Sequence, residues 1–512
     1  MQKEELLAYF SQLVPDGNWK RLGTTFQTQN SKYFYDTGTG KVLECEENEF
    51  LVVENILRHS GLSSLEETGL SEDSLLTALE NIKLLTETEK IFQAPVYNKF
   101  RSQDMEVKQN HNIHQIILEL TEQCNLRCRY CVYNEDHEDF RGFSTKNMTW
   151  EIAKKALDFA ITHSEEEFFV TFYGGEPLLQ FPLMKQCMDY TIEKIGKKKK
   201  VHFGFTTNLT LVTREMAEYF ASLESCIITG SVDGPEEIHD ANRIMVSHTG
   251  SFSKAMKGLK LLIDCMGEKK AGDAIGINAV LTPPYTVEKI EGINQFFRSI
   301  PWLPENITIR TSYMQGSNKK QVKKQGQGMT EMPENMETLE KSDPLEYWRL
   351  DKICQQKDEE IKYNMNNSNL ARIQHRIIAA EPIQFMEQNG CCAPGERRLY
   401  VTTAGKFHVC ERIGESPVIG DVENGMNLEA IKKYYIDEYA KESLPDCSNC
   451  WAVHLCSLCY ASFYDEEGIN IEKKKALCRD RKIMAINDLI SYHQIMEQNS
   501  AYLDRYCSEE PK

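Results

Sequence analysis

Six short β-rich runs between residues 116 and 313 constrain the fold more than any other feature of this chain. They are IILELT (116–121), FFVTFYG (168–174), HFGFTTN (202–208), CIITGSVDG (226–234), AIGINAVLT (274–282) and NITIRTSY (306–313). Segments of helical length separate them, which is typical of a parallel sheet covered by crossover helices. Six βα units are fewer than the eight of a closed barrel. We therefore predict an α/β fold, a partial (β/α)6 barrel whose active site lies at the carboxyl ends of its strands.

Residues 1–105 are predicted to form a separate, small α+β domain of winged-helix-like pattern. The stretch KYFYDTGTGKVLEC (32–45) is typical of two β segments joined by a Gly-rich turn, and an amphipathic helix is expected near residues 47–58. A further helix begins at the Ser71 cap. Because a hairpin beside an amphipathic helix offers an unpaired strand, we expect a free edge near Lys32–Asp36.

The rest of the chain divides by composition and pattern. We assign residues 106–314 to the barrel, 315–385 to a polar linker and bridging region, 386–480 to a Cys-rich domain and 481–512 to a C-terminal helix.

The charge of the chain argues against nucleic acid as a partner. It carries 77 acidic and 59 basic residues, a net charge of −18, so it has no general attraction to phosphate backbones. No run of 18 apolar residues and no basic n-region with an apolar core occurs in it. We expect a soluble, cytoplasmic protein without a membrane partner.

Seventeen cysteines are too many for packing alone, and a reducing cytosol does not favour disulfides. Thiolate ligands for metal are the natural alternative. We interpret six scattered cysteines as small buried hydrophobes: Cys45, Cys187, Cys226, Cys265, Cys354 and Cys507.

Three cysteines in TEQCNLRCRYC (121–131) directly follow the first β-rich run. Cys124, Cys128 and Cys131 are too few for a structural zinc site, which needs four ligands. Three thiolates on a 4Fe-4S cluster leave one iron open for a non-protein ligand. A chance structural triad is the alternative.

This motif, CxxxCxxC with the aromatic Tyr130 before its last cysteine, resembles that of the radical S-adenosylmethionine (SAM) enzymes. YGGEP at the end of the second run matches the family's GGE element, which implies that Gly174, Gly175 and Glu176 hold the methionine ammonium group of SAM. The segment GSVDGPEEIHDANR (230–243) resembles that of peptide- and sulfatase-modifying members. The match implies that Ser231 contacts the cosubstrate ribose or methionine, and that Arg243 pairs with the methionine carboxylate.

Several polar residues near these motifs are assigned by position alone. Thr206 and Asn208 end the third run and are expected to line the SAM pocket. We interpret Asp233, His239 and Asp240 as loop and cap formers.

A second cysteine field resembles the SPASM extension, which carries two auxiliary 4Fe-4S clusters. It consists of CCAPGERRLYVTTAGKFHVC (391–410), CSNCWAVHLCSLC (447–459) and Cys478. The resemblance implies one auxiliary cluster on Cys447, Cys450, Cys456 and Cys478, and another on Cys410, Cys459 and Cys391 or Cys392. The usual spacing of three residues between the fifth and sixth cysteines is two here. A zinc ribbon is the alternative, but two CxxC pairs only five residues apart fit it poorly.

The whole arrangement resembles maturases of ribosomally made, Cys-rich peptides, which form thioether links. It implies three 4Fe-4S clusters, SAM, a precursor peptide whose leader is bound by residues 1–105, and a flavodoxin- or ferredoxin-type electron donor. Three alternatives stay open: a sulfatase-maturating enzyme, a peptide epimerase or carbon–carbon crosslinking enzyme, and an iron–sulfur electron carrier without turnover.

Overall fold

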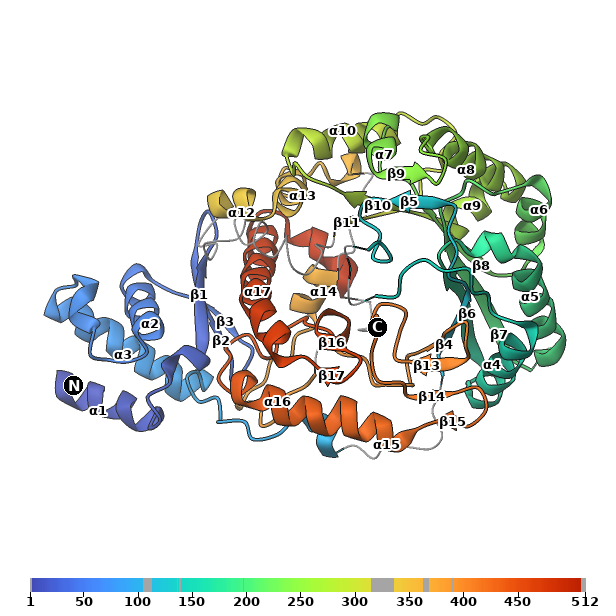
Figure 1. The fold of residues 1–512 in the computed structure, drawn as a ribbon. Coiled ribbons are helices and arrows are strands. Elements are labelled where there is room, and N and C mark those ends of the chain that lie inside the picture. The colour runs from blue at the N-terminus through green and yellow to red at the C-terminus, as the bar shows by residue number, and fades with distance from the viewer. Residues whose placement is uncertain are drawn as a thin grey trace.

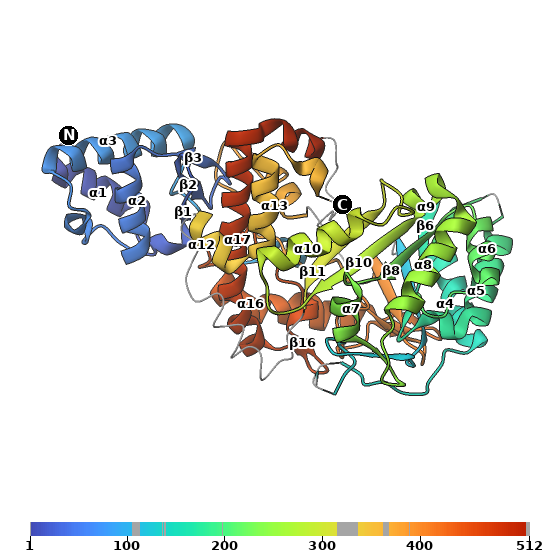
Figure 2. The ribbon, with the colours of Figure 1, turned by 90° about the horizontal axis from the view of Figure 1, so that it is seen from above.

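This computed structural model describes residues 2–104, 113–135, 137, 140–196, 198–314, 336–361, 368–388 and 390–507. A small N-terminal sheet with helices lies at one end of the molecule and a curved parallel sheet at the other, with the long helix α17 (Ile471–Asn499) between them (Figures 1 and 2). No helix in the described part of the chain is both long and apolar enough to cross a membrane.

The parallel sheet contains all six predicted strands, so the α/β fold class is confirmed. The strands are β4 (Gln115–Thr121), β6 (Glu167–Gly174), β7 (Lys200–Thr207), β8 (Cys226–Ser231), β10 (Ile275–Leu281) and β11 (Thr308–Tyr313). They lie side by side in chain order, and each pairs in parallel with the next. Parallel strands in chain order require a helical crossover after each strand.

Helices cover the convex face of this sheet (Figure 1). They are α4 (Trp150–His163), α5 (Phe181–Ile195), α6 (Arg214–Ser222), α7 (Glu236–Asn242), α8 (Phe252–Met266), α9 (Glu268–Ala274) and α10 (Val287–Arg298).

Strand β6 shows why these residues form a sheet with one covered face. Phe168, Val170 and Phe172 are fully buried and share a hydrophobic cluster with Leu157 of α4 and Met188 of α5. Burying each such side chain stabilises the fold by about 2 kcal/mol. The side chains between them point to the other side of the sheet, since successive residues of a strand alternate, and they are only partly buried. The concave side is therefore left for polar and aromatic groups.

The Cys-rich region continues the same sheet. Strand β12 (Arg398–Val401) pairs in parallel with β4, and β13 (Lys406–His408), β14 (Gly420–Asp421) and β15 (Gly425–Met426) follow as antiparallel neighbours. Ten strands thus form one sheet. The sequence alone did not predict this extension.

The C-terminal part is mainly helical. Its elements are α12 (Met336–Ser342), α13 (Pro344–Cys354), α14 (Ser368–Gln374), α15 (Leu428–Ala430), α16 (Glu438–Cys447), β16 (Tyr464–Asp465), β17 (Gly468–Ile469) and α17. The C-terminal helix was expected from about residue 480. It begins at Ile471 because the Asn470 side chain caps it by accepting a hydrogen bond from the backbone N–H of Lys473, so Cys478 lies on the helix. Of the predicted linker, residues 315–335 lie outside the described residues.

The N-terminal segment has the predicted α+β character. It contains α1 (Lys3–Leu13), β1 (Gly23–Gln27), β2 (Lys32–Asp36), β3 (Val42–Glu44), α2 (Glu47–His59) and α3 (Glu72–Glu89). The hairpin, the helix near 47–58 and the Ser71 cap are all present, and the Ser71 side chain accepts from the backbone N–H of Ser74.

The expected free edge at Lys32–Asp36 is wrong. This strand is β2, the middle strand of a sheet ordered β1-β2-β3, and both its edges are paired. The sequence reasoning missed β1, whose GTTFQ carries little apolar pattern. The terminal strand beyond the hairpin is β3.

The N-terminal sheet is docked on the C-terminal helices. Phe26, Tyr33 and Tyr35 are buried in one cluster with Leu489 and Ile490 of α17. The opposite face of the sheet packs against α2 and α3, and their side chains form a second hydrophobic cluster. Because both faces of the sheet are covered, β3 offers a surface for pairing only along its outer edge.

Candidate functional site

The three-cysteine loop leaves the carboxyl end of β4, where the sequence predicted the active site. It includes a short strand, β5 (Leu126–Cys128), and a turn in which the backbone N–H of Cys131 donates to the carbonyl of Cys128 over 3.0 Å. The Asn134 side chain also donates to this carbonyl, at 2.6 Å. These bonds hold Cys128 and Cys131 on one turn of chain.

The Gly174–Gly175 turn at the end of β6 is hydrogen-bonded to the start of this loop. The backbone N–H of Gly175 donates to the carbonyl of Thr121 at 2.9 Å, and that of Glu176 donates to the carbonyl of Gln123 at 2.8 Å. A Cβ on Gly174 would lie 2.2 Å from the Thr121 oxygen, and one on Gly175 would lie 2.1 Å from the Gln123 oxygen. Only glycine permits such close approach of two backbones.

Glu176 is almost fully buried and its carboxylate is occupied within the chain. It accepts hydrogen bonds from the Thr207 hydroxyl (2.8 Å), the backbone N–H of Asn208 (2.8 Å) and that of Leu178 (3.1 Å). Burial raises the pKa of Glu176, and these hydrogen bonds oppose that rise. The Glu176 side chain therefore orients Asn208, whose side chain lies 4.0 Å from the Cys124 sulfur.

Arg243 reaches the loop through a strand pair that the sequence gave no sign of. It begins β9 (Arg243–Met245), which pairs antiparallel with β5 so that Arg243 lies opposite Cys128. Its guanidinium donates to the hydroxyl of Tyr130 at 2.6 Å, and this hydroxyl donates to a carboxylate oxygen of Asp233 at 2.6 Å. Burial raises the pKa of Asp233, while the nearby Arg243 charge opposes the rise.

The remaining two predicted pocket residues lie on neighbouring strands. Ser231 is buried at the last position of β8, beside Asn278 of β10. Thr206 is exposed near the end of β7 and pairs with Thr229 of β8. Both positions are at the carboxyl end of the sheet, on the side of the cysteine loop.

The auxiliary cysteines lie in two groups of four. Burial raises the pKa of Cys478 and Cys447, and the nearby Cys456 thiol raises both further. Burial likewise raises the pKa of Cys450, to about 11, with Cys456 and Cys447 adding to the effect. The assignment of Cys447, Cys450, Cys456 and Cys478 to one auxiliary cluster stays a prediction.

The second group consists of Cys391, Cys392, Cys410 and Cys459. Burial raises the pKa of Cys410 to about 12, and Glu411, Cys459 and Cys392 add to that effect. Burial also raises the pKa of Cys391, with Cys459 the next contributor. Cys392 therefore lies near both Cys410 and Cys459, whereas Cys391 lies near Cys459 and Cys456.

The donor set suits iron–sulfur clusters, whose ligands are thiolates. All seventeen cysteines are free thiols. Within the described ranges, no three His, Cys, Asp or Glu side chains lie close enough together to bind one ion. A cubane spreads its thiolates over separate irons, so grouped but separated thiols suit it.

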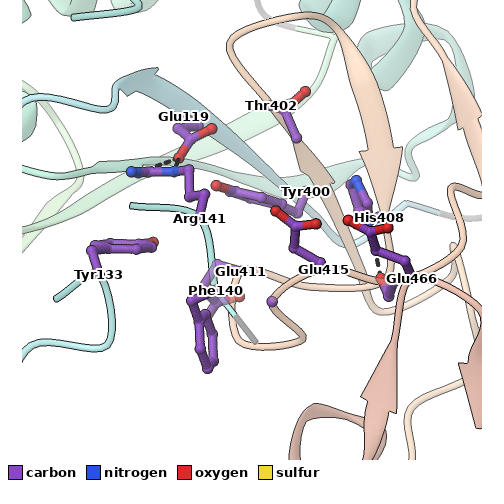
Figure 3. A pocket seen from close by; sticks show the side chains of 12 residues that line it. Glu119, Tyr133, Phe140, Arg141, Tyr400, Thr402, His408, Glu411, Glu415 and Glu466 are labelled. Carbon is purple, nitrogen blue, oxygen red and sulfur yellow. Dashed lines mark hydrogen bonds and ion pairs between the residues drawn. The ribbon is translucent and has the colours of Figure 1, made fainter. Parts of the chain in front are cut away.

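A cavity of about 220 Å³ is lined by β4 and the segment after the three-cysteine loop on one side, and by the β12–β13 hairpin and the loop that follows it on the other (Figure 3). It is lined by Glu119, Tyr133, Phe140, Arg141, Tyr400, Thr402, His408, Glu411, Gly414, Glu415, Ser416 and Glu466. On one wall Arg141 is ion-paired with the buried Glu119 and stacks 3.9 Å from the centre of the Tyr133 ring. Burial lowers the pKa of His408 to about 4, so this imidazole is neutral at pH 7.

Sequence reasoning missed Asp233 and the Glu119–Arg141 pair as parts of the site. Asp233 was interpreted as a loop former, and its partner Tyr130 lies 103 residues away in the chain. Glu119 did carry a signal, since it is the one charged residue in IILELT. A carboxylate in an otherwise apolar strand points to the functional, concave side of the sheet.

One family model matches part of the chain. Residues 118–297 match the model of the radical SAM superfamily, so this part of the chain is similar to a radical SAM domain. The matched residues include the three-cysteine loop, the Gly-Gly turn and Arg243. This domain implies a 4Fe-4S cluster and SAM.

Two curated relatives match about a third of this chain. The cysteine-type anaerobic sulfatase-maturating enzyme of Clostridium novyi is 30% identical over 158 residues, 30% of this chain and 40% of that protein. The antilisterial bacteriocin subtilosin biosynthesis protein AlbA of Bacillus subtilis is 33% identical over 148 residues, 28% of this chain and 30% of its own. The chain thus spans less than half the length of these two relatives.

A solved structure has a similar fold. The structure described as native anSMEcpe with bound AdoMet and Cp18Cys peptide superposes with a TM-score of 0.51, at 17% identity, covering 77% of this chain and 98% of that chain. At this identity the likeness concerns the fold alone.

Proposed function

We propose that this chain is a radical SAM peptide maturase that abstracts a hydrogen from a ribosomally made, Cys-rich precursor and forms intramolecular Cys thioether crosslinks. One observation carries the SAM-dependent part. Arg243 is only 7% exposed, lies beside the three-cysteine loop, and its Nε has no partner within the described residues. An unpaired, buried guanidinium donor suits the carboxylate of a bound amino acid, as in SAM.

Eleven cysteines supply ligands for three 4Fe-4S clusters in this proposal. Cys124, Cys128 and Cys131 would hold the cluster with an open iron, and the two auxiliary groups would hold the others. When bound, the first cluster supplies an electron that cleaves SAM and generates the radical that removes a substrate hydrogen. A flavodoxin- or ferredoxin-type protein would provide that electron.

The chain's own groups hold and orient SAM. The backbone of Gly174 and Gly175 would accept from the ammonium group, since the turn places peptide carbonyls beside the cysteine loop. The Glu176 carboxylate acts on SAM binding indirectly, because it accepts a hydrogen bond from the backbone N–H of Asn208 and so fixes that residue. Ser231, Tyr130 and Thr206 would line the rest of this pocket.

This cavity is the proposed place of the peptide core. Its walls come from β4 and the segment after the three-cysteine loop on one side, and from the hairpin before Cys410 and the loop after it on the other. The Glu119–Arg141 pair would offer hydrogen bonds to a peptide backbone, and the aromatic wall would exclude water.

The leader would bind along the outer edge of β3 rather than β2. The backbone N–H of Cys45 donates to Lys32 and that of Asp36 donates to Lys41, both between β2 and β3. Because hydrogen-bonding direction alternates along an antiparallel strand, Val42 and Glu44 direct their backbone groups outward. A leader could add there as a further strand.

Replacing Glu44 with Pro tests this edge. Proline removes the outward N–H but no bond to β2, so binding of a synthetic leader from a neighbouring small open reading frame should weaken about tenfold. Glu44→Ala, which keeps the N–H, is the matched control and should bind normally. Fluorescence anisotropy measures both affinities, and equal binding by the two variants would exclude β3 as the docking strand.

Product mass decides the type of bond. A thioether removes two hydrogens per link and consumes one thiol, whereas an epimerase leaves the mass unchanged and introduces solvent deuterium at an α-carbon. Sulfatase maturation is the second candidate, because the Clostridium relative has that activity by its description. Incubating the anaerobically reconstituted protein with SAM, dithionite and either a Cys-rich precursor or a sulfatase-derived Cys peptide, followed by mass spectrometry, separates the three.

A further inference from the structure

A closed circuit of hydrogen bonds surrounds Arg243. On its side-chain half, the Arg243 guanidinium donates to the Tyr130 hydroxyl, which donates to one carboxylate oxygen of Asp233, each over 2.6 Å. The other carboxylate oxygen of Asp233 accepts from the backbone N–H of Val280 in β10 at 3.1 Å. The Asp233 carboxylate is therefore fixed to the sheet, and it fixes the tyrosine in turn.

The backbone half of the circuit fixes the same arginine. The Ser251 hydroxyl donates to the carbonyl of Arg243 at 2.6 Å, and the Nε2 of His239 lies 3.0 Å from this hydroxyl. Since the hydroxyl has one proton, His239 must donate through Nε2. Its Nδ1 is then free to accept the backbone N–H of Asp233, at 3.4 Å. One neutral tautomer of His239 satisfies every bond.

The Tyr130 hydroxyl prevents the Asp233 carboxylate from occupying the hydrogen-bond donors of the Arg243 guanidinium. Arg243 and Asp233 approach only to 4.0 Å, because the Tyr130 hydroxyl lies between them. A direct bidentate ion pair between Arg243 and Asp233 would occupy the guanidinium donors with the aspartate. Here one donor serves Tyr130, while the Nε of Arg243 stays buried without a partner in the part of the chain that the structure describes.

We infer that Asp233 is a positioning residue for SAM binding: through Tyr130 it aims the Arg243 guanidinium at the carboxylate of SAM. This inference rests on the proposed function. Asp233 touches no cosubstrate itself. Its effect on affinity must therefore pass through Arg243 and must require a carboxylate on the ligand.

The test uses the full chain, reconstituted without oxygen, in the variants Asp233→Asn and Tyr130→Phe. Equilibrium dialysis and the change in the electron paramagnetic resonance spectrum of the reduced protein measure binding of SAM and of decarboxylated SAM. We expect both variants to bind SAM about tenfold more weakly, since Asp233→Asn removes the charge from the acceptor of the Tyr130 hydroxyl, and Tyr130→Phe removes the bonds to both Asp233 and Arg243. Binding of decarboxylated SAM should change less than about twofold.

The chain supplies a matched control. On α4 and α5, the Tyr190 hydroxyl donates to Asp158, and Lys154 also donates to that carboxylate, at 2.8 Å. This is the same tyrosine, aspartate and cation chemistry on the outer side of the barrel. Asp158→Asn and Tyr190→Phe should leave both affinities and the iron content unchanged.

A double-mutant cycle separates positioning from a general loss of structure. In an Arg243→Ala background, Asp233→Asn should weaken SAM binding by less than about twofold further, because its route through the guanidinium is gone. Additive losses, or equal losses for SAM and decarboxylated SAM, would overturn the inference. If both site variants bind SAM as tightly as the unmodified chain does, the inference is wrong and the proposed function is unaffected. If the unmodified chain binds no SAM, the proposed function fails and the inference with it.

Discussion

A single methyl group at position 175 tests whether the Gly-Gly turn sets the place of the three-cysteine loop. In Gly175→Ala the new Cβ would lie 2.1 Å from the carbonyl oxygen of Gln123, 2.5 Å from its carbon and 3.0 Å from the nitrogen of Cys124. All three are backbone atoms, so no side chain can rotate away. The loop must move by about 1 Å to restore an ordinary contact.

The cost follows from the bonds that this movement breaks. The turn and the loop are joined by the bonds from Gly175 to Thr121 and from Glu176 to Gln123, at 2.9 and 2.8 Å. Lengthening both in a buried setting should cost about 2–4 kcal/mol. We expect Gly175→Ala to lose most of the iron held by the loop and its SAM cleavage, while urea denaturation shows the barrel still folded.

Gly204→Ala is the matched control. It lies on β7 of the same sheet, and its new Cβ would meet the Ile227 oxygen at 3.5 Å and the Thr171 hydroxyl at 3.6 Å, both ordinary contacts. Iron analysis, SAM cleavage and urea midpoints should match the unmodified chain. If Gly175→Ala retains full iron and cleavage, the backbone contact does not position the loop and the reasoning is wrong.

The remaining predictions concern metal content and pH. Reconstituted protein should contain about twelve irons, and replacing Cys124, Cys128 and Cys131 together with Ala should remove about a third of that iron and all SAM cleavage; zinc in place of iron would contradict the assignment. Burial lowers the pKa of His493 to about 4, where its ring lies 5.0 Å from that of Tyr33 at the docked N-terminal sheet. A base with a lowered folded pKa stabilises fully above its unfolded pKa of about 6.5 and loses that contribution as the pH falls toward 4. In urea denaturation, the loss of stability between pH 8 and pH 5 should therefore be about 2 kcal/mol smaller for His493→Gln than for the unmodified chain.

The strands of the barrel were predictable because each is a local apolar run with its own period. The strand pairs that complete the site were not. Arg243 lies opposite Cys128 in a three-residue ribbon, β5 with β9, and these two residues are 115 positions apart in the chain. No local pattern encodes such a contact, and the arginine was placed by resemblance alone.

The error at the N-terminal sheet has a different cause. The hairpin was correctly predicted, but strand β1 reads GTTFQ, where only Phe26 is strongly apolar. A strand whose polar residues lie between two covered faces leaves little periodic signal. Without it, β2 was given an edge that in fact pairs with β1. Asp233 was underrated for a related reason, since residue type alone cannot show that a loop carboxylate faces a tyrosine from another loop.

The pairing of β12 with β4 makes one rigid piece of two regions that carry different thiol groups. The three-cysteine loop extends from β4, and Cys410 follows two residues after β13, which hydrogen-bonds to β12. The separation between these groups is therefore set by a backbone ladder and not by a flexible junction between domains. Electron tunnelling weakens steeply with distance, so it matters that this backbone ladder fixes the separation between the two thiol groups. Under the proposed function, the distance between the first cluster and the auxiliary cluster near Cys410 would stay the same whether the cavity is empty or filled.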